Sequence, residues 1–228
     1  MSETSEPVEY TLGADDTIEA ANPAFWRFAS ANEATLTERD VLGTSLFRFI
    51  ADTATAQVYR ALHRCVRETG RPLVLPYRCD SPERLRGLEM VISPLADSRL
   101  LIRNLTRRIE RRPGGRAVRL AHGRAAGGRR PYHPMLRFCS ICNRGAVSRD
   151  GWMELHDLVS SEFERFAGEP IAAVTQPCSH CIGELVDRAD SCLRGCREAS
   201  GNAVDMHRRL ARLSRELEHL RRRASVAG

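Results

Sequence analysis

Two CxxC pairs constrain this chain more than any other feature of its sequence. The pairs are Cys139-Ser-Ile-Cys142 and Cys178-Ser-His-Cys181, and 35 residues separate them. Each pair can form a tight turn that presents two sulfur atoms, and four sulfur atoms suit the tetrahedral coordination of zinc. The separation exceeds the ~15–20 residues of the commonest zinc pattern, so residues 151–174 must supply a helix and a strand that bring the pairs together. We therefore predict a structural zinc site made by all four cysteines.

Two alternatives remain open for these cysteines, namely a redox-active dithiol and unligated thiols in an apolar core. The first is less favoured because a thioredoxin-like motif needs only one pair. The sequence does not distinguish zinc from iron, since sulfur ligands in a tetrahedron suit both. His180, inside the second pair, could replace a cysteine ligand. With four cysteines available, we expect its ring to face solvent.

The segment between the pairs predicts one helix and one strand. Leu155, Leu158, Val159 and Phe163 lie at helical spacing from Trp152 to Phe166, and residues 171–174 predict a short strand. Trp152 is expected to fill the small core of this lobe. A lobe of this size buries too little apolar surface to fold alone, so we expect it to unfold without metal while the preceding domain stays folded.

The composition is that of an ordinary globular chain of 228 residues, 42% of them hydrophobic. No apolar run approaches the ~18 residues of a membrane span, and the N-terminus lacks the basic and then apolar order of a secretory signal. We therefore expect a cytoplasmic protein without membrane contact. In that compartment the eight cysteines would be reduced.

Positive charge is concentrated in one segment. All 35 basic residues are arginine, and residues 103–137 contain 11 of them against Glu110 alone, within a net charge of +6 for the chain. Residues 107–134 are rich in arginine, glycine and proline and predict a linker. Such a linker could bind nucleic acid by counterion release. A solvated spacer is favoured because no aromatic residues are interleaved with the arginines.

The first 106 residues contain a recognisable order of elements. We expect a hairpin, a short helix, a long helix and then three strands. The expected ranges are 8–12 with 17–22 for the hairpin, 24–29 and 53–68 for the helices, and 73–79, 88–92 and 100–105 for the later strands.

This order resembles the PAS domain. The residues that carry the resemblance are Ile18, Asn22, Ala24, Phe25, Val41-Leu-Gly43, Phe49-Ile50 and Pro94-Leu95. In addition, Tyr77-Arg-Cys-Asp-Ser-Pro82 and the cysteine segment around Trp152 resemble a group of small bacterial PAS proteins with a C-terminal CSxC turn, a tryptophan and a second CxxC. The combined resemblance covers about residues 8–185.

The PAS resemblance implies a five-stranded antiparallel sheet that cups helices and often senses a ligand or pairs with another PAS domain. It does not identify the ligand. Haem would need an axial ligand, and His63 on the long helix is the one candidate. We expect His63 instead to be a partly exposed residue at the edge of that helix.

An uninterrupted 3-4 spacing follows the second cysteine pair. Its members are Ile182, Leu185, Ala189, Cys192, Cys196, Ala199, Ala203, Met206, Leu210, Leu213, Leu217 and Leu220. The spacing predicts a coiled-coil seam in which Glu216 faces Arg221 on the parallel helix of a second copy. Gly195 and Gly201 each weaken the helix by about 1 kcal/mol, so Asn202 can cap a second helix. We favour a dimerising helix from Asn202, with a helix folded back on its own chain as the alternative.

Four cysteines lie outside the CxxC pairs. Cys192 and Cys196 share a helix face and could bind metal or be oxidised across a dimer, although filling of the apolar seam is favoured. Cys65 and Cys79 are expected to be small buried residues, because neither has a metal-spaced neighbour.

Together these observations predict an α+β chain. Residues 1–106 form a PAS-like sheet domain, 107–134 a linker, 135–185 a four-cysteine zinc lobe and 186–228 a helical tail. The sequence contains no phosphate-binding glycine loop, nucleophile elbow, kinase signature or HExxH motif, and four cysteine ligands leave zinc no open position for a substrate. The expected function is therefore non-enzymatic sensing or regulation, in which the PAS domain acts through the zinc lobe on a protein partner or a second copy. Nucleic-acid binding and a thiol redox switch are the alternatives.

Overall fold

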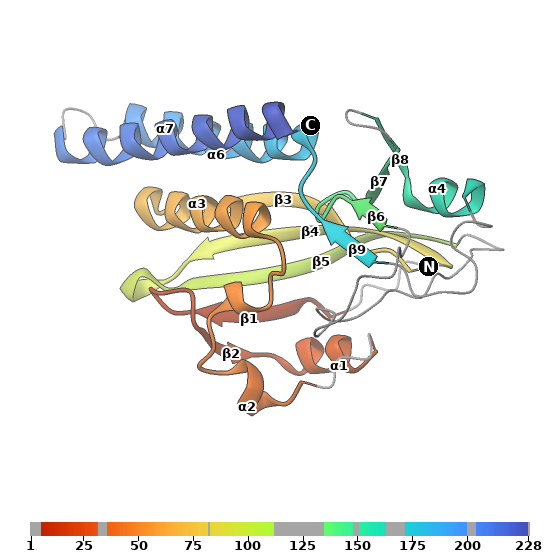
Figure 1. Cartoon of the computed structure of the whole chain (residues 1–228). Coiled ribbons are helices and arrows are strands. Elements are labelled where there is room, and N and C mark those ends of the chain that lie inside the picture. Colours follow the sequence, from red (N-terminus) through yellow and green to blue (C-terminus); the bar gives the residue numbers. More distant parts are fainter. Residues whose placement is uncertain are drawn as a thin grey trace, which may run out of the picture.

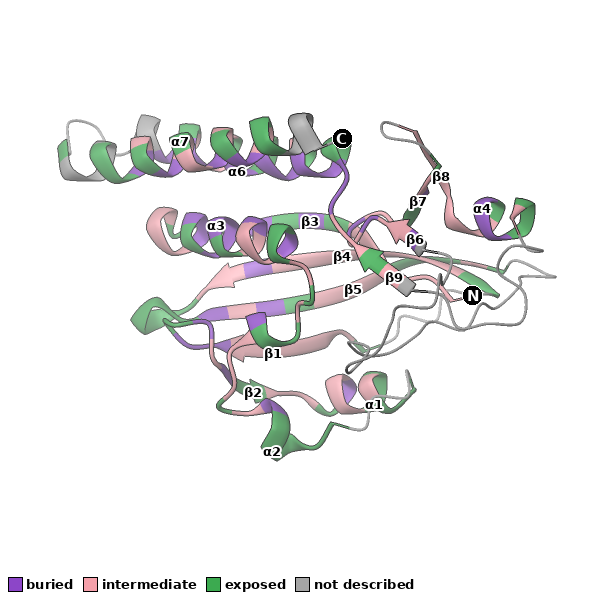
Figure 2. Ribbon diagram, in the orientation of Figure 1, coloured by how far each residue is buried: buried purple, intermediate pink, exposed green. Residues whose placement is uncertain are grey.

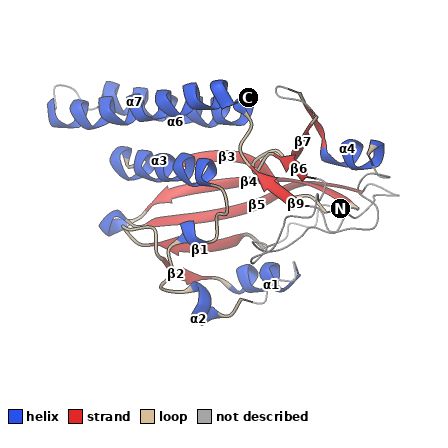
Figure 3. Cartoon of the chain, in the orientation of Figure 1, coloured by secondary structure: helices blue, strands red, loops and turns tan. Residues whose placement is uncertain are grey.

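The chain has an α+β fold built from two sheets and a stack of helices (Figure 1). The computed structural model describes residues 6–31, 36–81, 83–111, 135–147, 151–162, 172–199 and 204–227. Helices and strands are distinguished in Figure 3. Up to residue 111 the elements are β1 (Val8–Leu12), β2 (Ile18–Ala21), α1 (Pro23–Ala31), α2 (Glu38–Val41), η1 (Leu46–Arg48), α3 (Thr53–Thr69), β3 (Leu73–Arg78), β4 (Arg84–Pro94), η2 (Ala96–Ser98) and β5 (Leu100–Arg111). They are followed by β6 (Met135–Phe138), β7 (Arg144–Ala146), β8 (Trp152–Glu154), α4 (Leu155–Ser161), β9 (Ala172–Thr175), α6 (Ser179–Ala199) and α7 (Val204–Ala227).

The large sheet has the strand order β2-β1-β5-β4-β3, and every pairing in it is antiparallel. Side chains alternate between the two faces of a strand, and one face carries the core. Its fully buried members include Leu12, Leu75, Ile92, Leu100 and Ile102. The predicted hairpin, both predicted helices and the three later strands are confirmed, and β4 and β5 are longer than expected.

The long helix α3 covers one end of this apolar face. Asp52 caps its N-terminus by accepting hydrogen bonds from the amides of Ala54 and Thr55. Gly70 ends it in the left-handed conformation, with a φ of 63°, which glycine adopts without steric cost. The apolar stripe of α3, which includes Val58 and Leu62, is buried against the sheet core.

Strand β5 continues into the segment that was expected to be linker. It ends at Arg111, whereas the linker was expected from residue 107. In this extension Arg107 pairs with Glu89 and Arg108 with Glu110. Arg103, at the start of the basic segment, also pairs with Glu9, so three arginines of this segment are engaged in ion pairs. Residues 112–134 lie outside the described part of the chain.

A smaller four-stranded sheet follows, with the order β8-β7-β6-β9. The predicted strand near residues 171–174 is present as β9. The predicted helix from Trp152 to Phe166 needs correction, because Trp152 lies in β8 and α4 begins only at Leu155. Residues 152–154 pair with β7, and this pairing outweighs the helical spacing of the apolar residues. Phe163 and Phe166 are outside the described residues.

The C-terminal segment folds back on its own chain instead of presenting a dimer seam. Helices α6 and α7 pack against each other and against α3, and buried residues line their facing sides (Figure 2). Leu210, Leu213, Leu217 and Leu220 are all buried in this stack. Glu216 and Arg221, expected to pair between two copies, pair instead with Arg64 and Asp187 of the same chain. Asn202, the expected cap, is outside the described residues.

The cysteine segment and the large sheet share one hydrophobic core. The same cluster of buried residues contains Leu75 and Ile102 of the sheet, Cys139 and Cys181 of the CxxC pairs, and Leu217 of α7. The cysteines are therefore not in a separate core of their own lobe, as was expected. A small separate cluster of Leu136 and Leu158 lies in the same segment, away from the cysteines. Within the described residues, no helix combines the length and the apolar character needed to cross a membrane.

We predict that Leu217→Ala lowers the free energy of unfolding by ~2–5 kcal/mol, because it removes a fully buried side chain from the helix stack. Denaturant titration at two protein concentrations measures this loss. Val204→Ala is the control, since Val204 of the same helix is 63% exposed, and it should change stability by less than about 0.5 kcal/mol. A loss that grows on dilution would show that the seam joins two copies.

Candidate metal centre

Parallel pairing of β6 with β9 brings the two CxxC pairs together. Phe138 is opposite Thr175 in this pairing, and the strands run in the same direction, so their C-terminal ends meet. Cys139 follows β6 directly, and Cys178 follows β9 after Gln176 and Pro177. The long separation in sequence is thus closed by strands at its two ends.

The four sulfur atoms of the CxxC pairs all lie within 4.8 Å of one another. Cys139, Cys178 and Cys181 are buried, and Cys142 is partly exposed. Among the described residues, this is the one group in which three or more potential ligand atoms come so close. The predicted ligands are therefore together, and their four soft donors can hold a metal ion.

Backbone amides point at these sulfur atoms. The amides of Ile141, Cys142 and Cys178 donate to Cys139 Sγ over 3.4, 3.5 and 3.2 Å, and the Cys181 amide donates to Cys178 Sγ over 3.4 Å. Hydrogen bonds of this kind stabilise thiolate relative to thiol. The second pair also straddles the N-terminus of α6, where the helix dipole favours negative charge.

The proton distribution within the cluster favours metal binding. The pKa of Cys139 lies below the ordinary thiol value, first because the Cys142 thiol donates to it and then because Cys178 and Cys181 do. The pKa of Cys181 is raised, first by its hydrogen bond to Cys139. Free thiols share protons in this arrangement, and a metal ion replaces those protons when it binds.

The first cysteine pair is hydrogen-bonded to the beginning of α3. Ser140 Oγ and Thr55 Oγ1 are 2.6 Å apart, and the Thr55 hydroxyl also donates to the carboxylate of Asp52. Since the Thr55 proton goes to Asp52, Ser140 is the donor to Thr55. The helix cap of α3 is thereby connected directly to the turn at residues 139–142, called the metal turn below.

The same turn is also fixed to the edge strand of the large sheet. The Arg78 amide at the end of β3 donates to the Ile141 carbonyl over 2.8 Å. Arg78 Nη1 donates to both carboxylate oxygens of Glu154, at 3.0 and 2.7 Å, while Nη2 pairs with Asp80. Charge-assisted bonds of this kind are among the stronger hydrogen bonds, so β3 holds both the metal turn and the end of β8.

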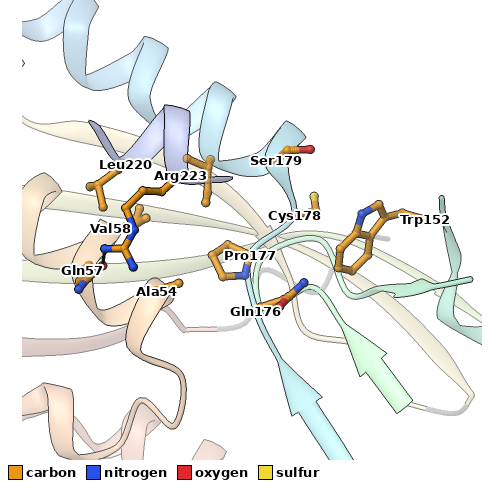
Figure 4. Close-up of a pocket in the computed structure, with 11 residues that line it drawn as sticks. Ala54, Gln57, Val58, Trp152, Gln176, Pro177, Cys178, Ser179, Leu220 and Arg223 are labelled. Atoms are coloured by element: carbon orange, nitrogen blue, oxygen red, sulfur yellow. Dashed lines mark hydrogen bonds between the residues drawn. The ribbon is translucent and has the colours of Figure 1, made fainter. Parts of the chain in front are cut away.

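A small pocket of about 110 Å³ lies beside the metal centre. It is lined by Val58 of α3, Pro177 and Cys178 of the second turn, Arg223 of α7 and Trp152 of β8 (Figure 4). Trp152 is partly buried and packs against the core that the cysteines share with the large sheet, whereas it was expected to fill a core of the cysteine segment alone. The pocket is large enough for only a few water molecules.

A larger cavity of about 420 Å³ lies under α1, on the apolar face of the large sheet beyond α3. Phe25 of α1, Tyr10 of β1, Tyr77 of β3, Met90 of β4 and Asn104 of β5 contribute to its wall. The Tyr77 hydroxyl donates to Asn104 Oδ1 over 3.0 Å. Its volume is within the ~300–1,000 Å³ typical of small-molecule sites.

A second hollow of about 380 Å³ lies beside the cysteines. Tyr77 and Leu88 line both spaces, and Cys142 and Cys181 line the second. The cavity and the cysteine group therefore share wall residues through this hollow.

The two histidines considered as ligands have other roles. The side chain of His180 is 69% exposed and lies 3.6 Å from Glu184, so it faces solvent as expected. His63 was expected to be partly exposed, but it is only 1% exposed, and its Nδ1 lies 2.8 Å from Asp16 Oδ1. Arg67 Nη2 donates to the same oxygen over 2.8 Å. Burial alone would raise the pKa of Asp16, but the bonds from His63 and Arg67 outweigh burial and lower it.

Comparison with known proteins gives no family for this chain. A scan against protein-family models finds no match, and a search of curated proteins finds no similar sequence. The PAS resemblance thus stays a prediction, and the α+β fold with its four-cysteine group is what the structure establishes.

Sequence reasoning found the four ligands but not the groups that position them. Ser140 lies inside the first CxxC pair and Arg78 inside the motif at residues 77–82, but neither pattern indicates a positioning role, and Thr55 falls in no motif. Each acts through a contact between residues far apart in the chain. The one available signal is the Asp-Thr-Ala-Thr start of α3, because aspartate is a favoured N-cap residue. Nothing in that pattern indicates Ser140 as its neighbour.

We predict that Thr55→Val accelerates removal of the metal by a chelator and lowers stability by ~1–3 kcal/mol, because Ser140 and Asp52 each lose a hydrogen-bond partner. Chelator kinetics and denaturant titration measure the two effects. Thr53→Val, at the exposed first residue of α3, is the matched control. Equal kinetics for the two variants would show that the Ser140 contact does not support the metal turn.

Proposed function

We propose that this chain is a non-enzymatic sensory or regulatory protein of the PAS type, in which a ligand cavity is coupled to a structural zinc centre. The observation that carries the proposal is the position of β3. Its residue Tyr77 lines the cavity, and the amide of the next residue, Arg78, bonds the Ile141 carbonyl in the metal turn. A ligand that moves Tyr77 acts on the metal turn through one peptide unit.

Zinc is the metal proposed for the centre. The donor set consists of four sulfur atoms, three of them buried, as in closed structural zinc sites. Zinc has no redox chemistry of its own, which suits a site that shares the core of the whole chain. Cys139, Cys142, Cys178 and Cys181 would hold the ion, and its contribution there is to fix the two cysteine turns at one point.

The cavity wall indicates the class of ligand. Burial raises the pKa of both Tyr10 and Tyr77, so both phenols are neutral at physiological pH. Tyr10 and Phe25 form an edge-to-face aromatic pair with ring centroids 5.8 Å apart. At the mouth, Arg27 is already paired with Glu6. Neutral hydrogen-bonding groups among aromatic and aliphatic side chains suit a small uncharged, partly aromatic molecule.

The output of such a module is proposed to be a protein partner or a second copy of the chain. The apolar face of α7 packs against α3 and α6 of the same chain. It is therefore not available for a dimer contact, and any interface lies elsewhere on the surface. Nucleic-acid binding remains an alternative, and the pairing of Arg107 and Arg108 removes part of the charge that motivated it. Its signature would be binding that weakens steeply between low and physiological salt.

We predict that native mass spectrometry of the chain, purified without added metal, shows one zinc ion and a small organic adduct. Met90→Trp should fill the cavity and abolish the organic adduct while the zinc ion stays, because Met90 lines the cavity and is not in contact with the cysteines. Ile109→Trp, at an exposed position of β5, is the control that keeps both. A wild-type protein without an organic adduct, or a Met90→Trp variant that retains it, would contradict the sensory proposal.

We also predict that removing the metal affects more than the cysteine segment. Chelation or Cys139→Ser should speed amide exchange in residues 139–146, at Arg78 and in the first turn of α3, because these segments share hydrogen bonds and one core. Hydrogen exchange with and without chelator measures the extent. Cys79→Ser, at a thiol outside the centre, should keep the metal and the protection. Protection unchanged by chelation would refute the structural role of the metal.

A further inference from the structure

A second group of thiols lies between α3 and α6, away from the metal centre. Cys65 belongs to α3 and is fully buried, whereas Cys192 of α6 is partly exposed. The Cys65 thiol donates to the Ala189 carbonyl over 3.7 Å. Ala189 is three residues before Cys192, so Cys65 packs against the helical turn that carries Cys192.

The two cysteines are neighbours across the helix interface. Each thiol lies close enough to shift the pKa of the other. Thr69, one turn after Cys65 on α3, places its hydroxyl oxygen 3.4 Å from Cys192 Sγ while donating to the Cys65 carbonyl over 2.7 Å. A buried thiol and a partly exposed thiol from distant parts of the chain are therefore held together by helix packing.

A positive charge also reaches this site because residue 195 is glycine. A Cβ atom placed on Gly195 would lie only 2.3 Å from Arg71 Nη1, a distance that any larger residue would have to relieve. Gly195 is less than one helical turn from Cys192 on α6. The glycine that weakens α6 as a helix thus allows the guanidinium to lie against it.

These surroundings give the two thiols opposite character. The pKa of Cys192 is lowered to about 6, first by the neighbouring side chain of Cys65 and then, against the effect of burial, by the positive charge of Arg71. The pKa of Cys65 is raised, first by the neighbouring Cys192 and then by burial. Cysteines that react with oxidants are typically partly exposed, carry thiolate character and lie beside a second thiol.

We propose that Cys192 is a site of oxidation by hydrogen peroxide and that Cys65 resolves it, forming a disulfide that joins α3 to α6. The proposal does not depend on the cavity or on the identity of the metal. A metal ion is a less suitable occupant, because the described residues around Cys65 and Cys192 do not bring three ligand atoms within 4.8 Å of one another.

The chemistry balances without a cofactor. The Cys192 thiolate attacks one peroxide oxygen, the O–O bond breaks, and hydroxide leaves and takes a proton to become water, which leaves a sulfenic acid on Cys192. The Cys65 sulfur then attacks the Cys192 sulfur, the S–S bond forms and the S–O bond breaks. The departing hydroxide takes the proton of Cys65. Two thiols lose two electrons in total, and one peroxide becomes two water molecules.

The disulfide would lock two helices that both reach the metal centre. Helix α3 carries Thr55, which contacts Ser140 of the first metal turn, and α6 carries Cys181 in its first turn. A cross-link between them limits any movement of α3 relative to the metal ligands. Peroxide would then be a second signal, besides the cavity ligand, and it would act on α3 and α6.

The test uses the full-length, metal-loaded chain, treated with one equivalent of hydrogen peroxide at neutral pH and mapped by alkylation and peptide mass spectrometry. We expect a Cys65–Cys192 disulfide that dithiothreitol reverses. Cys65→Ser should stop the reaction at a sulfenic acid on Cys192 that dimedone traps, and Cys192→Ser should abolish both products. Cys196→Ser, at the buried neighbour one turn later, should leave the disulfide unchanged.

A kinetic readout separates this reactivity from simple accessibility. Cys79 is also partly exposed, but burial raises its pKa, so Cys192 should be alkylated at least about threefold faster at pH 7, after its lower intrinsic nucleophilicity is allowed for. Arg71→Gln should move the pH midpoint of Cys192 alkylation upward from about 6. First oxidation at the four metal ligands, a Cys192–Cys196 product, or a midpoint unaffected by Arg71→Gln would overturn the proposal.

Discussion

The parallel pairing of β6 with β9 is the constraint on which the rest of the structure depends. It brings together two turns that are 35 residues apart, and four sulfur atoms then meet at one point. Parallel neighbours need a long connection, which residues 143–171 supply. The turn at residues 139–142 is hydrogen-bonded to both β3 and α3, and the turn at residues 178–181 leads into α6. The centre therefore joins the large sheet to the helix stack.

Gathering four thiolates at one point would be costly, and the surroundings show how that cost could be offset. A divalent ion bound there would neutralise half of their charge, four amide-to-sulfur hydrogen bonds would act on the remainder, and the α6 N-terminus would add its dipole. Metal–thiolate binding contributes an apparent ~10–16 kcal/mol in small domains, as much as the ~5–15 kcal/mol net stability of a typical protein. A centre of that strength, placed in a shared core, stabilises the sheet as well as its own segment.

The sequence predicted what depends on local pattern. Alternation in residues 8–12 and 73–79 gave the strands, the helix expected at residues 53–68 is present as α3 (Thr53–Thr69), and the CxxC spacing gave the ligands. It did not predict that His63 is buried on Asp16, 47 residues away, or that Ser140 bonds Thr55, 85 residues away. These contacts depend on how distant elements pack. The 3-4 spacing of α6 and α7 indicated an apolar face but not which helix covers it. The same spacing is expected whether this face packs against another chain or against α3.

The same argument explains why cysteines in one chain differ in chemistry. At the metal centre, each sulfur has three sulfur neighbours, and the sulfurs of Cys139 and Cys178 also accept from backbone amides, so a metal ion is the natural replacement for the shared protons. Between α3 and α6, Cys192 lies beside one other thiol and a guanidinium, which stabilise a thiolate without completing a ligand set. Cys79 has neither environment, and burial keeps it protonated. Identity as cysteine therefore fixes little, and the number and charge of the groups around each sulfur decide between metal ligand, reactive thiol and inert core residue.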